Sequence, residues 1–223
     1  MDILLDLDGT LTDPREGITR CIQYALETLD RPVPRQADLL GCIGPPLHAS
    51  FVALLDGDEG LAHRAVSLYR ERFGEVGLFE NAVYDDIPGA LDALRDGGAR
   101  LYVATSKPTI YARRITTHFG LDERLDDVFG SELDGKRSDK RDLLSHIVRS
   151  LSLDPTETVM VGDRRHDMLG AHRNRIRGIG VTWGYGARAE LLEAGASGLL
   201  ERPGQLASIA DRSGILARRF DHG

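Results

Sequence analysis

Two aspartates, Asp6 and Asp8, follow a short apolar run near the start of the chain, in the stretch ILLDLDGTLTD (residues 3–13). On an extended backbone, residues two apart point to the same side, so the two carboxylates would crowd one spot. Like charges about 4 Å apart repel by about 4 kcal/mol at a protein surface. Such a pair therefore needs a proton, a cation or a catalytic task, unless the Asp-Gly sequence marks a solvated turn.

Three later segments carry further polar residues of chemical interest, each beyond the end of an expected strand. Thr105 and Ser106 follow LYVA, Lys140 opens a helix, and Asp163 and Asp167 follow TVMVG. In open α/β sheets, ligands bind beyond the carboxyl ends of the strands. Because all these residues fall at such ends, as the first acid pair does, the sequence predicts that they share one site.

Each of these residues also has an ordinary structural interpretation. The hydroxyl pair could cap the helix expected after Pro108, and the two late aspartates could be first-turn acids favoured by the helix dipole. Lys140 could be a solvated lysine, although the first turn of a helix disfavours a cation by ~0.3–1 kcal/mol. The sequence has only three lysines, Lys107, Lys136 and Lys140, and Lys136 is the rival for the same role.

The combined set of side chains suits one kind of site. Several carboxylates need a hard divalent cation, and oxygen ligands favour Mg²⁺. Hydroxyls and a lysine would then hold the oxygens of a phosphoryl group. A calcium-binding loop is excluded for DLDG because its glycine should stand at the sixth position, whereas Gly9 is fourth and Thr10 is fifth.

Alternating strand and helix patterns place these residues on an α/β fold. A first strand is expected at residues 2–7, and the alternation starts again after residue 84. The later expected strands are 100–105, 128–129, 158–162 and 176–183, and the expected helices are 88–96, 108–119, 139–151 and 166–173. Such alternation predicts a Rossmann-like parallel sheet with helices on both faces.

The intervening block, residues 14–84, has helical patterns and no convincing strand. Asp13 can cap a helix that begins at Pro14 and continues with an apolar face. Further helices are expected at 36–41, 45–55 and 59–74. The block is therefore expected to be an all-helical insertion after the first strand.

Composition narrows the class of protein. The formal net charge of −7 disfavours a general nucleic-acid binder. No apolar stretch approaches the ~20 residues of a membrane helix, and the acidic start MDILLDLDGT is unlike a signal peptide. We therefore expect a cytoplasmic protein that binds neither membranes nor nucleic acid. Cys21 and Cys42, the only cysteines, lack metal-binding spacing and are expected to be reduced.

Four motifs, in this order, resemble those of the phosphatases of the haloacid-dehalogenase superfamily: DLDGTLTD, ATSK, the lysine of SDK, and VGDRRHD. The resemblance covers nearly the whole chain. It implies an α/β hydrolase core, residues 1–13 and 85–223, with a helical cap, residues 14–84, inserted after the first motif. The chain departs from the family pattern in SDKRD, where a proline often follows the lysine, and at Arg164, where a small residue is common.

The same resemblance implies a role for each motif residue. Asp6 would be the nucleophile that forms an aspartyl-phosphate, and Asp8 would protonate the leaving oxygen and then activate water. Mg²⁺ would be held by the Asp6 carboxylate, the Asp8 backbone carbonyl and Asp163, with Asp167 assisting directly or through water. The residues implied to bind the transferring phosphate are Thr105, Ser106 and Lys140.

Other functions can be weighed against phosphomonoester hydrolysis. The superfamily's dehalogenases lack the second acid and its phosphonatases need a cap lysine, whereas this chain has Asp8 and no lysine before Lys107. Sugar phosphomutases share every core motif and are the alternative. A catalytically silent phospho-ligand binding protein would have lost Asp6 or Asp8. A receiver-type signalling domain would carry its acceptor aspartate on a middle strand and would not need a cap.

Substrate choice is expected to lie in the cap. IGPPL, VGDRRHD and WGYG are similar to the phosphoglycolate-phosphatase group and its 5′-nucleotidase-like branch, which implies a small soluble phosphomonoester. The loop at 41–51 could contact this substrate through Gly44 and His48, or could simply connect two helices. Arg20 is a further candidate, and we expect a monomer or homodimer.

Overall fold

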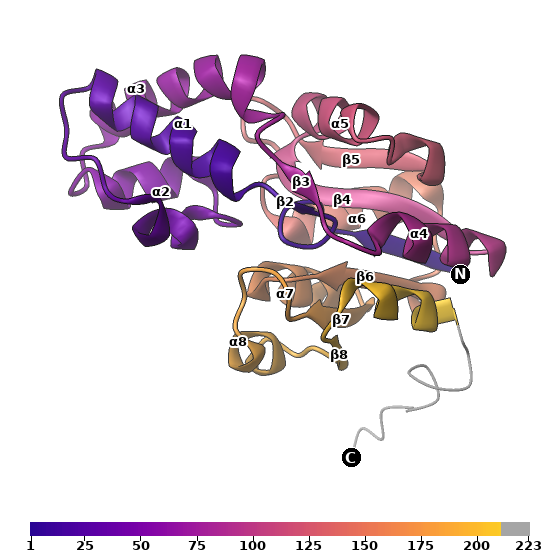
Figure 1. The fold of residues 1–223 in the computed structure, drawn as a ribbon. Helices are drawn as coiled ribbons and strands as arrows, with labels where there is room; N and C mark the ends of the chain where they lie inside the picture. The colour runs from indigo at the N-terminus through magenta and orange to yellow at the C-terminus, as the bar shows by residue number, and fades with distance from the viewer. Residues whose placement is uncertain (211–223) are drawn as a thin grey trace. The chain divides into compact units, whose positions relative to one another are not determined.

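The structure, a computed structural model, describes residues 1–210 (Figure 1). Its backbone falls into two compact units. One comprises Met1–Leu11 and the chain from Val83 onward, and the other comprises Thr12–Ala82. The assignment of these units as hydrolase core and cap, with boundaries after residues 13 and 84, stays a prediction. Within residues 1–210, no helix combines the length and the apolar character that crossing a membrane requires.

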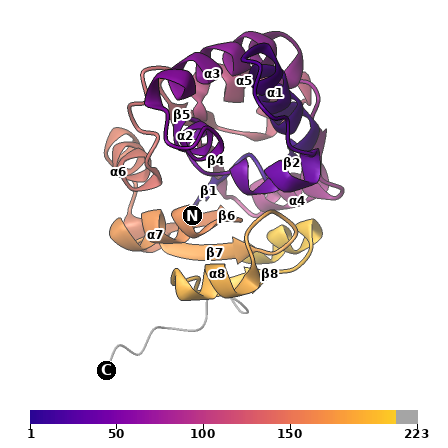
Figure 2. The same cartoon turned by 90° about the vertical axis from the view of Figure 1, so that its left-hand side faces the viewer.

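A six-stranded parallel sheet forms the frame of the first unit, and Figure 2 shows its strands following one another in the order β5-β4-β1-β6-β7-β8. β1 pairs in parallel with both β4 and β6, with Leu5 opposite Val103 and Val161. Residues that follow these strands are therefore neighbours at the carboxyl end of the sheet. The strands are β1 (Asp2–Leu5), β4 (Arg100–Pro108), β5 (Asp127–Ser131), β6 (Thr158–Gly162), β7 (Arg177–Val181) and β8 (Gly198–Leu200).

The central strands are buried on both faces, which explains why their sequences are continuous apolar runs. Every residue of β1 and of β6 is buried. Leu4 belongs to a core cluster with Met160 of β6 and with Leu143 of α6 (Lys140–Leu151), the helix that precedes β6. Because side chains alternate along a strand, Ile3 points to the opposite face of the sheet. The apolar packing on both faces holds the ends of the strands in place.

Helices connect the strands and cover the sheet. They are α4 (Ile87–Asp96), α5 (Thr109–His118), α6 (Lys140–Leu151), α7 (Arg165–Arg173) and α8 (Arg188–Glu193). Short 3-10 helices lie at Asp122–Arg124, Pro155–Glu157 and Pro203–Ala210. The predicted Rossmann-like α/β arrangement is confirmed, with element ends shifted by a few residues. The sequence does not predict α8 and β8, because RAELLE and GLL are too short to show a period.

The second unit is helical. Its elements are α1 (Arg15–Thr28), a 3-10 helix (Gln36–Cys42), α2 (Leu47–Leu54), α3 (Glu59–Arg72) and a π-helical turn (Phe73–Gly77). Helix α3 lies against both α1 and α2. The chain enters at β2 (Thr12–Asp13) and leaves at β3 (Ala82–Val83), two short strands that form their own sheet.

Helix α1 begins one residue later than predicted. Asp13 belongs to β2, so Pro14 takes the N-cap position and α1 starts at Arg15. The Asp13 carboxylate still accepts a hydrogen bond from the Arg15 N–H at 3.0 Å. The expected apolar face is buried and includes Ile18, Cys21, Ile22, Ala25 and Leu26.

Candidate active site

The first acid pair lies at the carboxyl end of β1. Asp6 directly follows the strand, and its N–H donates to the Val161 carbonyl of β6 at 2.9 Å, which fixes the backbone at this point. Asp163 directly follows β6, and Thr105 lies in the second half of β4. Since β4 and β6 flank β1, the sheet itself brings these segments together.

Three aspartates form a buried acidic group at this end of the sheet. Carboxylate oxygens of Asp6, Asp163 and Asp167 all lie within 4.8 Å of one another. Asp163 Oδ2 accepts a hydrogen bond from the Tyr185 N–H at 2.7 Å. Its Oδ1 is buried and makes no hydrogen bond with any residue in the range 1–210. The structure thus brings together the three carboxylates predicted to serve one metal ion.

Gly9 leaves the space that the Asp163 carboxylate occupies. Its φ is +79°, in the left-handed region that favours glycine. A Cβ atom at this position would lie 2.2 Å from Asp163 Oδ2. Any side chain here would therefore strain the backbone and clash with the carboxylate. This explains why the DLDG motif has glycine at this position.

Lys140 supplies a positive charge inside the acidic group. Its Nζ lies 3.1 Å from Asp6 Oδ1 and 2.7 Å from Asp167 Oδ1, and it donates to the Ala104 carbonyl of β4 at 2.8 Å. Burial alone would lower the pKa of Lys140, but the negative charges of Asp167 and Asp6 raise it to about 12. Lys140 is therefore charged and is not a solvated surface lysine. The rival Lys136 has a side chain 71% exposed.

Burial also disfavours the charged forms of the acids. It raises the pKa of Asp163 well above its ordinary value, and the charges of Asp167 and Asp6 add to this effect. It raises the pKa of Asp167 to about 6, against the opposing charge of Lys140. The Lys140 ammonium group contacts two of these three carboxylates, and an oxygen of the third, Asp163, has no hydrogen bond among the described residues. This all-oxygen donor set fits a hard divalent cation such as Mg²⁺.

Asp8 has a different partner, Lys107. Asp8 Oδ2 lies 3.0 Å from Lys107 Nζ, and the two side chains are 13% and 6% exposed. Burial raises the pKa of Asp8; the positive charge of Lys107 opposes this and the Asp6 charge adds to it. A carboxyl with a raised pKa can keep a proton that it later donates. Lys107 is absent from the predicted site, although its place in ATSK and the scarcity of lysine were available signals.

The two hydroxyl residues do not cap a helix. Thr105 and Ser106 lie within β4, and α5 begins only at Thr109 without a side-chain cap. Thr105 is buried, and its Oγ1 accepts a hydrogen bond from the Lys107 N–H at 3.2 Å. The Ser106 carbonyl accepts a hydrogen bond from the Ser131 hydroxyl at 2.9 Å. The hydroxyl pair therefore lies in the strand beside β1, and the capping interpretation is wrong.

The three residues expected to contact substrate lie in the helical unit. Gly44, with φ +101°, precedes α2. Arg20 of α1 forms an ion pair with Glu80 at 2.9 Å. His48, in the first turn of α2, lies 3.3 Å from Glu59. Their contact with a substrate stays a prediction.

A family model described as haloacid dehalogenase-like hydrolase matches residues 3–181. The chain belongs to this family. It is 50% identical over 190 residues to a 5′-nucleotidase of Pseudomonas aeruginosa, which covers 85% of this chain and 86% of the relative. It is also 36% identical over 213 residues to the tyrosine-protein kinase PtkA of Mycobacterium tuberculosis, covering 96% of this chain and 72% of that one.

A solved structure extends the likeness to the whole fold. The crystal structure of a predicted phosphatase from Clostridium acetobutylicum has a TM-score of 0.89 and 42% sequence identity, and the match covers 93% of this chain and 96% of that one. The resemblance drawn from the four motifs is therefore confirmed, as is the prediction of an enzyme of the phosphatase class.

Proposed function

We propose that this haloacid dehalogenase-like protein is a Mg²⁺-dependent hydrolase of small phosphomonoesters that acts through an aspartyl-phosphate. The observation that carries the proposal is the buried group of Asp6, Asp163 and Asp167 with Lys140 inside it, at the carboxyl end of β1. A nucleophile, a cation site and a phosphate-binding lysine would then share one edge of the sheet.

Asp6 is assigned as the nucleophile. Its Oδ1 accepts a hydrogen bond from the Leu7 N–H at 2.8 Å and lies beside the Lys140 ammonium, so the carboxylate is held in one orientation. Attack of an Asp6 oxygen on phosphorus forms the P–O bond of the aspartyl-phosphate, and the bond to the leaving oxygen breaks with its electron pair.

Asp8 is assigned as the general acid and base. Its carboxyl donates a proton to the leaving oxygen, and the resulting carboxylate then takes a proton from the water that attacks the aspartyl-phosphate. The products are an alcohol, inorganic phosphate and regenerated Asp6. The raised pKa of Asp8 supports this assignment because the reaction must start with a protonated carboxyl.

The residues assigned to hold Mg²⁺ are Asp6, Asp163 and the backbone carbonyl of Asp8, with Asp167 acting directly or through water. When bound, the ion would neutralise part of the charge of the phosphoryl oxygens. The residues assigned to hold those oxygens are Thr105, Ser106 and Lys140. Lys140 also orients Asp6, since it already lies 3.1 Å from that carboxylate.

The substrate class is a nucleoside 5′-monophosphate or phosphoglycolate. The 50% identity to a protein named 5′-nucleotidase supports testing nucleotides first. The helical unit would act as a cap over a small cytoplasmic metabolite, with Gly44, His48 and Arg20 as candidate contacts, in a monomer or homodimer. A sugar phosphomutase is the alternative, and a silent phospho-ligand binding protein is the lesser one.

Phosphate release from nucleoside monophosphates, phosphoglycolate and hexose phosphates, with Mg²⁺ or with EDTA, tests the proposal. We expect Mg²⁺-dependent release, a hydroxylamine-sensitive phosphoryl label on the chain, and loss of both in Asp6→Asn with an unchanged circular dichroism spectrum. Robust turnover by Asp6→Asn would refute the assigned nucleophile. An isomerised hexose phosphate without free phosphate would favour the mutase. Phosphoryl transfer from ATP to tyrosine would instead favour the chemistry for which PtkA is named.

A further inference from the structure

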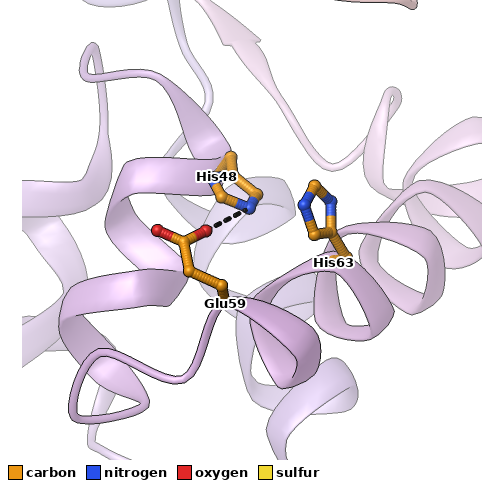
Figure 3. A group of neighbouring side chains, drawn as sticks. All are labelled: His48, Glu59 and His63. Atoms are coloured by element: carbon orange, nitrogen blue, oxygen red, sulfur yellow. Dashed lines mark ion pairs between the residues drawn. The ribbon is translucent and has the colours of Figure 1, made fainter.

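A second group of metal-type donors lies in the helical unit and consists of His48, Glu59 and His63 (Figure 3). The local sequence explains the arrangement. The Asp58 carboxylate accepts a hydrogen bond from the Leu61 N–H at 2.9 Å and thereby starts α3 at Glu59. Glu59 and His63 are four residues apart and so share one face of α3. His48 comes from α2, which packs against α3.

The three side chains lie close enough together to approach one small ion. One donor atom of each lies within 4.8 Å of the others. His48 Nε2 lies 3.3 Å from Glu59 Oε2, and ligands of a tetrahedral Zn²⁺ ion, about 2.0–2.2 Å from the metal, are separated by about 3.3–3.6 Å. The rings of His48 and His63 have centroids 4.4 Å apart. Figure 3 shows His48 lying between the other two side chains.

The Nε2 atom of His48 points to a ligand more directly. It is buried and makes no hydrogen bond within residues 1–210, although the Glu59 carboxylate is 3.3 Å away. The contact is an ion pair when the His48 ring is protonated, as Figure 3 draws it. A neutral ring with its proton on Nδ1 instead presents an Nε2 lone pair beside the Glu59 carboxylate, and a metal ion can use both. The Glu59 side chain is 68% exposed, so an ion can enter from solvent.

We propose that His48, Glu59 and His63 bind a divalent transition-metal ion of the Zn²⁺ type, with water completing the coordination. Two imidazoles and one carboxylate suit Zn²⁺, Ni²⁺ or Co²⁺, whereas Mg²⁺ prefers an all-oxygen set such as the acids of the sheet. Bound at this position, the ion joins α2 to α3. His48 is also a candidate substrate contact of the proposed phosphatase, but the test of this site reads metal binding and not turnover, so the two proposals can fail separately.

Titration of the full chain with Co²⁺, in excess Mg²⁺, tests the proposal. Nitrogen ligands in a tetrahedral site give strong visible absorption, whereas Co²⁺ in an octahedral oxygen site absorbs weakly. We expect strong bands that saturate at one ion per chain and that disappear when Zn²⁺ is added. Calorimetry then gives the Zn²⁺ affinity directly.

Substitutions assign the bands to these residues. In His63→Ala and in Glu59→Gln we expect the Zn²⁺ affinity to fall by at least about 10- to 100-fold, the loss that even an outer-shell partner can cause. His172→Ala, at an exposed histidine of α7, is the matched control and should bind as the parent does. Equal affinities for the parent and for a folded Glu59→Gln or His63→Ala variant, or only weak oxygen-type absorption, would overturn the proposal.

Discussion

The acidic group of the sheet unit and the histidine group of the helical unit are built in opposite ways. Asp6, Asp163 and Asp167 are assembled by the order of parallel strands, and all three are buried. Glu59 and His63 are neighbours on one exposed helix turn, and only His48 comes from a second helix. The first group is thus a consequence of the whole fold, and the second of two adjacent helices.

The two groups differ in burial, and therefore in whether their charges must be neutralised in the folded protein. Carboxylates buried together need protons, a lysine or a cation, because like charges repel strongly away from water. Glu59 and His63 are exposed and the His48 side chain is half-buried, so this group can be solvated and needs no metal to be tolerated. We therefore expect changes at the sheet site to affect folding and chemistry together, and changes at Glu59 or His63 to affect metal binding with little effect on folding or chemistry.

The largest effect is expected at the lysine inside the acidic group. Lys140→Met keeps much of the side-chain volume but removes the ammonium group between Asp6 and Asp167. Phosphatase activity should fall by about 100- to 1000-fold, as when a charged or polar donor is removed from a reacting group. The metal-free protein should lose about 3–5 kcal/mol of unfolding free energy. Steady-state kinetics and urea unfolding measure the two effects.

Lys136→Met is the matched control for this change. The Lys136 side chain is 71% exposed and lies 3.9 Å from Asp134, so its loss should alter stability by less than about 0.5 kcal/mol. The opposite ranking of the two variants would move the phosphate-binding lysine to Lys136.

A second prediction compares two glycines with left-handed backbone, one in each unit. Gly57→Ala, at φ +89° with no atom within 4 Å of the added Cβ, should cost only the backbone strain, about 1–2 kcal/mol. Gly9→Ala adds a clash with Asp163 and should cost a further ~1–3 kcal/mol, as well as weakening Mg²⁺ binding. Thermal unfolding with and without Mg²⁺ measures both. Equal losses in the two variants would mean that Asp163 moves aside without penalty.

The acidic group also predicts how pH changes the stability of the protein and its stabilisation by Mg²⁺. The pKa of Asp167 in the folded chain is about 6, above the ordinary 3.8, so the metal-free folded state binds more protons than the unfolded state between these values. Its unfolding free energy therefore falls as the pH rises through this window. Mg²⁺ binds the deprotonated carboxylates. The increase in the protein's melting temperature that Mg²⁺ causes should therefore be larger near pH ~7.5 than near pH ~5. An equal increase at both would contradict the acidic cation site, and Asp163→Asn should reduce the increase.

The convergence of the acids could be predicted because the strands and the motif residues that follow them are both visible in the local sequence. Apolar runs marked β1, β4 and β6, and the rule that ligands bind beyond strand ends placed Asp6 and Asp163 together. The sequence does not decide between Lys140 and Lys136, since only the ion pairs of Lys140 with Asp6 and Asp167 separate the two lysines. The conformation of Thr105 and Ser106 depended on how far β4 extends, which is a tertiary property.

Two contacts could not be predicted from the sequence, for the same reason. Lys107 meets Asp8, and His48 meets His63, only through contacts between segments that no local pattern connects. The substrate contact predicted for His48 rests on the turn before it, whereas its contacts with Glu59 and His63 depend on how α2 packs against α3. Side-chain pairs of this kind require the packing of elements to be known first.

The smallest effect, and the one that tests Lys107, is a shift in pH dependence. Lys107→Met removes the positive charge 3.0 Å from Asp8, so the pKa of Asp8, already raised by burial, should rise further. A proton donor with a higher pKa stays protonated to higher pH. The alkaline limb of the single-turnover transfer rate should therefore move up by about one pH unit. Lys107→Arg keeps the charge and should leave the limb in place. A uniform loss of rate in Lys107→Met, without movement of the limb, would make Lys107 a structural residue. Burial and the charge of Asp6 would then be the influences that determine the pKa of Asp8.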